Sequence, residues 1–274
     1  MGNRFAALCL AEDGEASAGA ASPPAEEALP KETARRWRRR ASPALPRLAA
    51  SPPPEEAAQP DDPGADGPPA DARQVPFDYY VVLDFECTCD AVNVHSHEII
   101  EFPAVFLNAR TLEFDMEFHR YVRPSERPTL TDFCTRLTGI EQRRVDDARP
   151  LEAVLDDFHE FLDTHSLVCS RGDRTVQQRL FVVCTDGPWD VRKFLRPESQ
   201  RKRIRLQPYW GRYVDVRQTF SDFMGCGRCG VAKMLQRLDM AFEGREHSGA
   251  DDARNIARIL RELLARGCKV SPHR

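Results

Sequence analysis

Two carboxylates interrupt a segment that is otherwise apolar. The run Tyr79-Tyr80-Val81-Val82-Leu83-Asp84-Phe85-Glu86 has the β-branched and aromatic composition of a strand covered on both faces. Because side chains alternate along a strand, Asp84 and Glu86 should share one face, with Cα atoms roughly 7 Å apart. Two like charges buried side by side cost several kcal/mol each unless a cation neutralises them. A pair of divalent metal ions would do so, which indicates phosphate chemistry.

A helix expected over residues 250–265 brings a third acid to the core side. Its apolar stripe consists of Ile256, Ile259, Leu260 and Leu263. One turn before Ile256, the same stripe reaches Asp252. Asp251 instead falls on the polar side with Asn255, where an acid in the first turn is favoured by the helix macrodipole. Asp252 is therefore the candidate ligand, and His247, five residues upstream, can reach the same end of the domain.

The fourth acid, Asp190, lies in the helix expected to begin after Pro188. It precedes Phe194 by one turn and so occupies an apolar face. Asp186 is the competing candidate, but its position before Gly187-Pro188 suits a turn or a helix cap. We therefore prefer Asp190.

Together these side chains form the donor set of a divalent metal site. Asp84, Glu86, Asp190 and Asp252 offer the hard oxygen ligands that Mg²⁺ and Mn²⁺ prefer. Two such ions bind the attacking and the leaving oxygen of a phosphodiester. His247 can activate water, because its unperturbed pKa is near neutrality.

From about residue 75 the pattern predicts an α/β domain that would position these residues. Expected strands cover 79–86, 98–107, 113–122, 180–184 and 213–216. Expected helices lie at 132–137, 151–162, from 186 onward, and near 217–224, 230–238 and 250–265. Three strands in succession indicate an antiparallel meander, and the later strand–helix alternation predicts a mixed sheet with helices packed against it.

Residues 1–73 have a different composition. They hold 12 of the chain's 21 prolines and are rich in Ala, Glu and Asp, so they cannot bury enough apolar area to offset the entropy of ordering. We expect a disordered arm that can recruit protein partners. Its basic cluster, Arg35-Arg36-Trp37-Arg38-Arg39-Arg40, is a nuclear-import signal, an RNA-binding patch or a solvated charge cluster.

The overall composition does not identify the substrate. The formal net charge is −4 and the sequence pI is near 6.0, so there is no global signature of polyanion binding. No apolar run approaches the roughly 18 residues that span a bilayer, and we recognise no secretory signal. Nine cysteines without a signal favour free thiols in a reducing, intracellular compartment, cytoplasmic or nuclear. Nothing indicates an obligate oligomer.

Two short motifs have open interpretations. Cys226-Gly227-Arg228-Cys229 is a CxxC, but a structural zinc site would need a second pair with matching spacing. Whether these two cysteines bind metal stays open. Gly2 suggests myristoylation, although Ala6 stands where Ser or Thr is preferred.

The order Asp84-x-Glu86, Asp190 and His247-x4-Asp252 resembles the DEDDh 3′–5′ exonucleases of the DnaQ-like, ribonuclease-H-like superfamily. Longer stretches, beginning with Leu83-Asp84-Phe85-Glu86-Cys87-Thr88-Cys89, resemble its histone-mRNA 3′-exonuclease (enhanced-RNAi) branch. The others cover 97–103, 132–140, 185–190 and 247–257. The resemblance extends over about residues 76–270. It implies a ribonuclease-H-like mixed five-stranded sheet flanked by helices.

The same resemblance implies roles for individual residues. Asp84, Glu86, Asp190 and Asp252 match the acids that hold two Mg²⁺ ions, for which Mn²⁺ can substitute. Glu86 and His247 match catalytic positions, with His247 as the general base beside the substrate. Phe133, Leu137, Trp189 and Thr88 match residues around the terminal nucleotide, where aromatic stacking accepts any base. The implied activity is release of nucleoside 5′-monophosphates from RNA 3′ ends.

Several alternatives remain open at this point. The same site would also serve a 3′–5′ DNA exonuclease, because the sequence contains no recognisable reader of the 2′-hydroxyl. A non-catalytic RNA-binding scaffold is the third interpretation, although all five site residues are present. The sequence has no counterpart of the SAP helical module found in some members of the branch. The natural RNA therefore stays open among histone mRNA, small RNA and ribosomal RNA.

Overall fold

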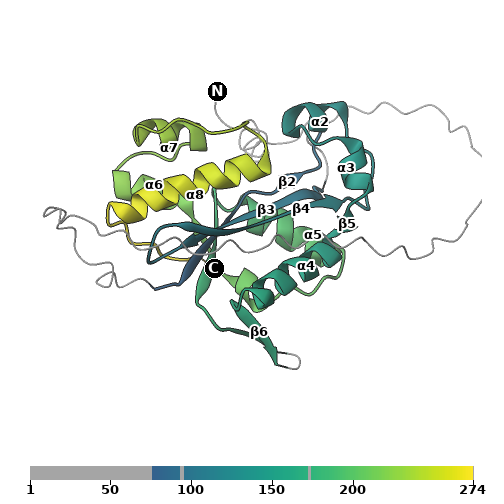
Figure 1. The fold of residues 1–274 in the computed structure, drawn as a ribbon. Coiled ribbons are helices and arrows are strands. Elements are labelled where there is room, and N and C mark those ends of the chain that lie inside the picture. The colour runs from purple at the N-terminus through teal and green to yellow at the C-terminus, as the bar shows by residue number, and fades with distance from the viewer. Residues whose placement is uncertain (1–75, 93–95, 172–173, 274) are drawn as a thin grey trace, which may run out of the picture. The chain divides into compact units, whose positions relative to one another are not determined.

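The computed structural model describes residues 76–92, 96–171 and 174–273 (Figure 1). The expectations for the 1–73 arm, its basic cluster and Gly2 fall outside the described residues. Within them, no helix is both long enough and apolar enough to cross a membrane.

A mixed sheet forms the centre of the fold, as the sequence predicted. Its principal strands are β1 (Tyr79–Leu83), β3 (Ile99–Asn108), β4 (Phe114–Arg123), β8 (Phe181–Thr185) and β9 (Tyr213–Asp215). The strand order is β5-β4-β3-β1-β8-β9. The two-residue strands β2 (Glu86–Cys87) and β5 (Arg149–Pro150) pair with β3 and β4, respectively. Pairing is antiparallel for β1–β3 and β3–β4, which confirms the meander, and parallel for β1–β8 and β8–β9.

Helices cover both faces of the sheet, because β1 is apolar on both sides. Tyr79, Val81 and Leu83 join one core with α4 (Leu151–Thr164). Tyr80 and Val82 join the other core. The second face is covered by α6 (Val216–Met224), α7 (Val231–Arg237) and α8 (Gly249–Ala265). Figure 1 shows α4 and α8 on opposite sides of the strands.

A third, smaller core lies under α2 (Asp132–Thr138) and α3 (Gln142–Asp146). The Thr131 hydroxyl caps the start of α2 by accepting a hydrogen bond from the Cys134 amide at 3.0 Å. Gly139, with φ +74°, ends the helix in the left-handed conformation that glycine adopts readily. These caps fix the length of α2.

Some elements differ from the sequence-based expectation. Val216 begins α6 and does not extend β9. The helix expected from residue 186 is a π-helix, η3 (Asp190–Leu195), followed by α5 (Arg196–Arg201). The pattern also gave no indication of α3, of the hairpin β6 (Val168–Arg171) and β7 (Arg174–Gln177), or of the 3-10 helix η4 (Pro208–Gly211).

Candidate active site

The strand expected to run from Tyr79 to Glu86 is broken at its first acid. Strand β1 ends at Leu83, opposite Ala104, and β2 resumes at Glu86, opposite Glu101. The register is unchanged across the gap, so Asp84 lies opposite Pro103. Proline has no N–H to donate to the ladder, and strand pairing lapses at this point. Because the register is kept, Asp84 and Glu86 still project to the same side.

The backbone freed by this break is bonded by another acid of the site. The Phe85 amide donates to Asp190 Oδ1 at 2.7 Å, while the Phe85 ring packs edge-on against Phe102. Asp190 follows β8, the parallel neighbour of β1, and its carboxylate is 3% exposed. A side chain distant in sequence thus takes the role of a missing strand partner, which positions Asp190 beside Asp84.

The start of α8 lies in direct contact with the backbone of the sheet. A Cβ atom added at Gly249 would stand 2.7 Å from the Asp84 carbonyl oxygen and 3.0 Å from Glu101 Oε2. The Gly249 amide donates to that Glu101 oxygen at 3.1 Å. The absence of a side chain at Gly249 therefore allows α8 to bring Asp252 against the two acids of the sheet.

Three of the expected acids converge at this point. Carboxylate oxygens of Asp84, Glu86 and Asp252 lie within 4.8 Å of one another. Burial and then repulsion from Asp190 raise the pKa of Asp84 well above its usual value. Burial and repulsion from Asp252 do the same for Glu86, and burial raises the pKa of Asp252 to about 7. Asp84 and Asp252 keep some solvent exposure, so the cluster is open on one side.

Asp186 and Asp190 bond different partners, and Asp186 has an ion-pair partner where the sequence predicted a turn or cap role. Asp186 is 6% exposed and accepts from Nε and Nη2 of Arg217 at 3.0 and 2.5 Å. The pKa of Asp190 is raised to about 7, because burial outweighs the opposing effects of hydrogen bonding and of the nearby Arg217 charge. Arg217, on α6, is a cation next to these two acids. Sequence analysis did not identify it.

The loop that carries His247 is held by the first two turns of α8. Three alternate backbone amides donate to this helix: Glu243 N to Asn255 Oδ1 at 3.1 Å, Arg245 N to Asp251 Oδ2 at 3.0 Å, and His247 N to Asp252 Oδ2 at 2.7 Å. Asn255, expected on the polar side of the helix, is fully buried there. His247 adopts φ +64°, which is rare for a residue with a side chain, and these bonds hold it there.

Arg245 connects the same loop to α2. Its guanidinium donates to the carbonyls of Thr138 at 2.8 Å, Leu137 at 3.0 Å and Arg136 at 3.1 Å. These are the last carbonyls of α2, which have no partner inside the helix and favour a cation. Arg245 therefore ties the His247 loop to α2. Its position in a loop provided no periodic signal by which the sequence could reveal it.

The residues expected around the terminal nucleotide lie on three segments. Phe133 and Leu137 are half-buried on α2. Trp189 precedes Asp190, is half-buried, and has Lys193 Nζ 5.8 Å from its ring centre. Thr88 follows β2 and is 8% exposed, and its hydroxyl accepts from the Glu98 amide at 3.0 Å.

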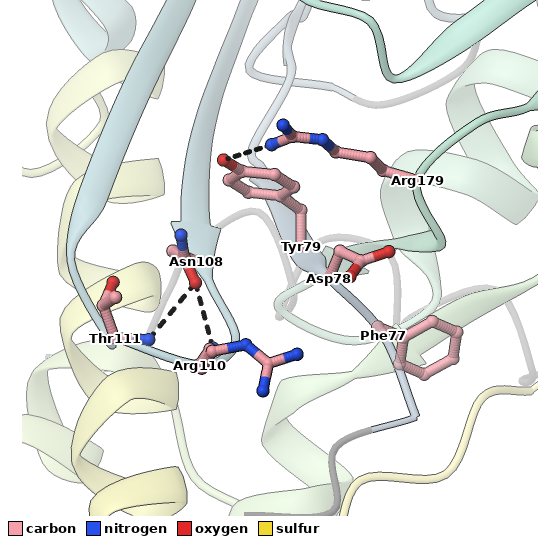
Figure 2. Close-up of a pocket in the computed structure, with 7 residues that line it drawn as sticks. All are labelled: Phe77, Asp78, Tyr79, Asn108, Arg110, Thr111 and Arg179. Carbon is pink, nitrogen blue, oxygen red and sulfur yellow. Dashed lines mark hydrogen bonds between the residues drawn. The ribbon is translucent and has the colours of Figure 1, made fainter. Parts of the chain in front are cut away.

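Two other features are not part of the acid cluster. Among the described residues, Asp84, Glu86 and Asp252 form the one group of three or more potential metal ligands, so no third ligand joins Cys226 and Cys229. A shallow pocket lies at the far end of β1, lined by Phe77, Asp78, Tyr79, Asn108, Arg110, Thr111 and Arg179 (Figure 2). Five residues of strand place it roughly 16 Å from Asp84. Its carboxylate, Asp78, already accepts from the Leu180 amide.

Comparison with known sequences supports the resemblance. A family model described as Exonuclease (RNase_T) matches residues 81–260. ERI1 exoribonuclease 3 of Homo sapiens is 40% identical over 192 residues, which cover 70% of this chain and 55% of that protein. The 3′-5′ exoribonuclease 1 of Homo sapiens is 37% identical over 198 residues, which cover 71% and 54%. The chain spans about half the length of these curated relatives.

Solved structures agree with the sequence comparison. The nuclease domain of 3′hExo, described as a DEDDh family member bound to rAMP, superposes with a TM-score of 0.68 at 36% identity, covering 73% of this chain and 98% of that one. Cell-death related nuclease 4 (CRN-4) superposes with a TM-score of 0.63 at 29% identity, covering 72% and 67%. The expected ribonuclease-H-like fold is confirmed. The chain belongs to the exonuclease family, and its relatives include exoribonucleases and a nuclease domain described as a DEDDh family member.

Proposed function

We propose that the protein is a metal-dependent 3′–5′ exoribonuclease that releases nucleoside 5′-monophosphates from RNA 3′ ends. The observation that carries this proposal is the convergence of Asp84, Glu86 and Asp252 carboxylates within 4.8 Å. It occurs in a domain whose relatives are named exoribonucleases. A related structure is described with a bound ribonucleotide, which favours RNA over DNA as the substrate.

The donor set fits two Mg²⁺ ions, for which Mn²⁺ can substitute. Asp84, Glu86, Asp190 and Asp252 would hold them, because every donor is a hard carboxylate oxygen. The raised pKa values of these buried acids reflect a shortage of positive charge. When bound, the ions would supply a lowered pKa of water and neutralisation of charge at the scissile phosphate.

His247 is the proposed general base. Burial lowers the pKa of its imidazole, which keeps the ring neutral near pH 7 and able to accept a proton from water. The bond from its backbone amide to Asp252 holds it next to the acid cluster. Glu86, the most buried of the three clustered acids, would orient the same water from the opposite side.

Trp189, Phe133 and Leu137 would form the pocket for the terminal nucleotide, with Thr88 at its edge. Stacking on apolar side chains accepts any base at about 1–3 kcal/mol per base. Arg245 would couple the two halves of this arrangement, because it joins α2 to the His247 loop.

The decisive experiment uses two 5′-labelled oligonucleotides of one sequence, one RNA and one DNA. We expect stepwise shortening of the RNA from its 3′ end in Mg²⁺, loss of activity in EDTA and recovery on adding Mn²⁺. The variant His247→Ala should fold and should be inactive. Faster shortening of DNA would indicate the DNA exonuclease instead, and binding without any shortening would indicate the scaffold.

We further propose that the nuclease domain spans residues 76–270 and acts inside the cell. All eight cysteines among the described residues are free thiols, which suits a reducing compartment. Protein partners of residues 1–73 are part of the same proposal.

A further inference from the structure

The segment 192–212 carries an unusual concentration of positive charge. It contains eight basic residues and one acid, Glu198, in a chain whose total charge is slightly negative. The segment comprises η3, α5, an extended stretch and η4. A local excess of this kind stands out against a nearly neutral domain.

Only part of this charge is neutralised within the protein. Lys202 pairs with Glu98 and Glu198, and Arg201 pairs with Glu126. The remaining exposed cations have no carboxylate within 4.0 Å in the described part of the chain, and we call them the basic face. They are Arg192, Lys193, Arg203, Arg205 and Arg212. On α8, by contrast, Arg254 and Arg258 pair with Glu117 and Glu243.

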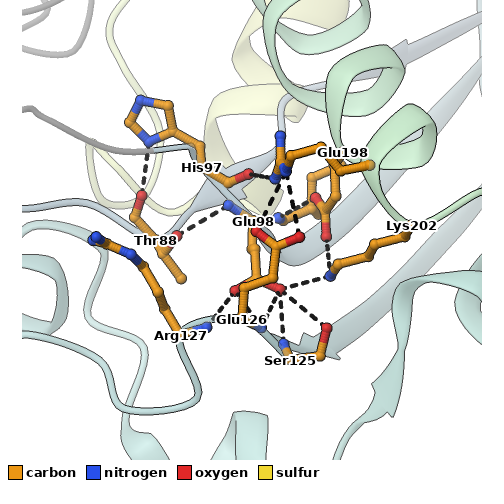
Figure 3. A network of polar contacts seen from close by, with 10 residues as sticks. Thr88, His97, Glu98, Ser125, Glu126, Arg127, Glu198 and Lys202 are labelled. Atoms are coloured by element: carbon orange, nitrogen blue, oxygen red, sulfur yellow. Dashed lines mark hydrogen bonds and ion pairs between the residues drawn. The ribbon is translucent and has the colours of Figure 1, made fainter.

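The basic face begins at the rim of the active site. Arg192 and Lys193 lie on η3, two and three residues after Asp190, and Lys193 Nζ is 5.8 Å from the Trp189 ring centre. At the end of α5, Arg201 donates to the carbonyl of His97 at 2.8 Å. His97 in turn contacts the Thr88 carbonyl at 2.8 Å through Nδ1 (Figure 3). The segment therefore begins beside Asp190 and, at the end of α5, contacts the residues near Thr88, which follows Glu86 by two positions.

Two further arginines of the basic face follow the end of α5. Ile204 and Leu206 pack against the core beneath, while Arg203 and Arg205 are exposed. Arg203 takes φ +57° in the turn that ends α5, and Arg205 follows in the irregular stretch after it. Exposed and unpaired arginines present a planar fork that fits phosphate oxygens.

We propose that the basic face binds the phosphates of the RNA strand 5′ to the scissile bond, and this proposal rests on the proposed exoribonuclease activity. The terminal nucleotide sits at Trp189 and the acids. The preceding phosphates contact Lys193 and Arg192 and then the exposed Arg203 and Arg205. The face therefore governs how tightly long substrates are held, and it leaves the chemical step untouched.

The test compares Arg203→Glu/Arg205→Glu with wild type on a 20-nucleotide unstructured RNA and on a dinucleotide. We expect KM for the 20-mer to rise about tenfold, and the slope of log(kcat/KM) against log[salt] to weaken by about 1.4, the contribution of two phosphate contacts on a single strand. Turnover of the dinucleotide, which is too short to reach Arg203 and Arg205, should stay at the wild-type rate.

Two further variants keep this test decisive. Lys233→Glu/Arg237→Glu reverses two exposed cations on α7, across the sheet, and should leave both substrates unaffected. Arg203→Gln/Arg205→Gln should give the same pattern at smaller size and replaces the Glu pair if that pair unfolds. An unchanged KM for the 20-mer, or an equal loss on the dinucleotide or in the α7 variant, would overturn the proposal. If the wild type degraded neither substrate, the proposed exoribonuclease function itself would be wrong.

Discussion

Buried carboxylates occur at two places beside β3, and the protein treats them in opposite ways. Glu98 accepts hydrogen bonds from the amides of Ser125, Glu126 and Arg127 and pairs with Lys202 Nζ at 2.6 Å (Figure 3). Burial alone would raise its pKa, but Lys202 and these amides outweigh burial and lower it. In the active site, burial and mutual repulsion raise the pKa values of Asp84 and Glu86.

The difference lies in where the compensating charge comes from. Around Glu98 the chain supplies its own cation, so the acid needs nothing from outside and ties α5 to β3. Around Asp84 the chain supplies further acids, with Arg217 already engaged by Asp186. A buried group of like charges that lacks an internal cation is the arrangement expected of a metal site.

Replacement of Asp84 by Asn should have the largest effect. We expect RNA hydrolysis in Mg²⁺ to fall by about 100- to 1,000-fold, the cost of losing one electrostatic contact to the transition state. The melting temperature in EDTA should rise, because one buried like charge is gone. The matched variant Glu98→Gln should do the reverse: a lower melting temperature with kcat retained in the folded fraction. If Asp84→Asn hydrolysed RNA at the wild-type rate, the assignment of Asp84 to a metal site would be wrong.

Replacement of Lys202 by Met should cause the largest loss of stability among these variants. It leaves Glu98 and Glu198 buried without their cation, which we expect to cost about 3–5 kcal/mol in the free energy of unfolding. Urea denaturation measures this cost, and the double variant Lys202→Met/Glu98→Gln should recover part of it. A loss below about 1 kcal/mol would mean that the compensation around Glu98 is not what stabilises it.

Raising the pH should destabilise the metal-free protein. The pKa values of Asp190 and Asp252 are about 7 in the folded state, above the roughly 3.9 of an unfolded Asp. Their protonated forms therefore favour folding at low pH, and this contribution is lost as the pH rises through about 7. We expect the melting temperature in EDTA to fall between about pH 4 and 7, by an amount equivalent to a few kcal/mol.

Mg²⁺ should reduce this fall, since it binds the ionised carboxylates of the folded protein. A melting temperature that is independent of pH in EDTA, or a fall that Mg²⁺ leaves unchanged, would contradict the prediction.

Replacement of Arg245 by Ala should have the smallest effect of the four. The loop keeps its bonds to Asp251, Asp252 and Asn255, so stability should change little. We expect kcat to drop about tenfold because misplacement of a catalytic group by a fraction of an ångström is costly. The acid limb of the pH–rate profile, which reports the pKa of His247, should shift because the loop that carries His247 is held less tightly.

Arg245→Lys should restore part of the rate, because its ammonium reaches some of the α2 carbonyls. Arg266→Ala, at the other end of α8, is the control. A change in KM alone would place Arg245 in substrate binding instead.

Much of the fold was predictable because its periodicity is strong. The five principal strands and the helices over α2, α4, α6, α7 and α8 match their expected positions closely. The short elements α3, η4 and the β6–β7 hairpin were not predicted, because a few residues provide too little periodicity to reveal them. The burial of Asn255 was not predicted for a different reason: polar side chains are normally exposed, and this one is buried to bond the Glu243 backbone.

By itself the sequence determined which acids are the candidates for the site, because a carboxylate on an apolar face is costly and therefore conspicuous. Only the tertiary structure decided how those acids meet. Asp190 replaces the strand partner of Phe85, Gly249 lets α8 touch the sheet, and Arg245 joins α2 to the His247 loop. Each contact connects residues more than 100 positions apart. Periodicity along a chain determines which face a side chain occupies, but its partner on another element follows from packing alone.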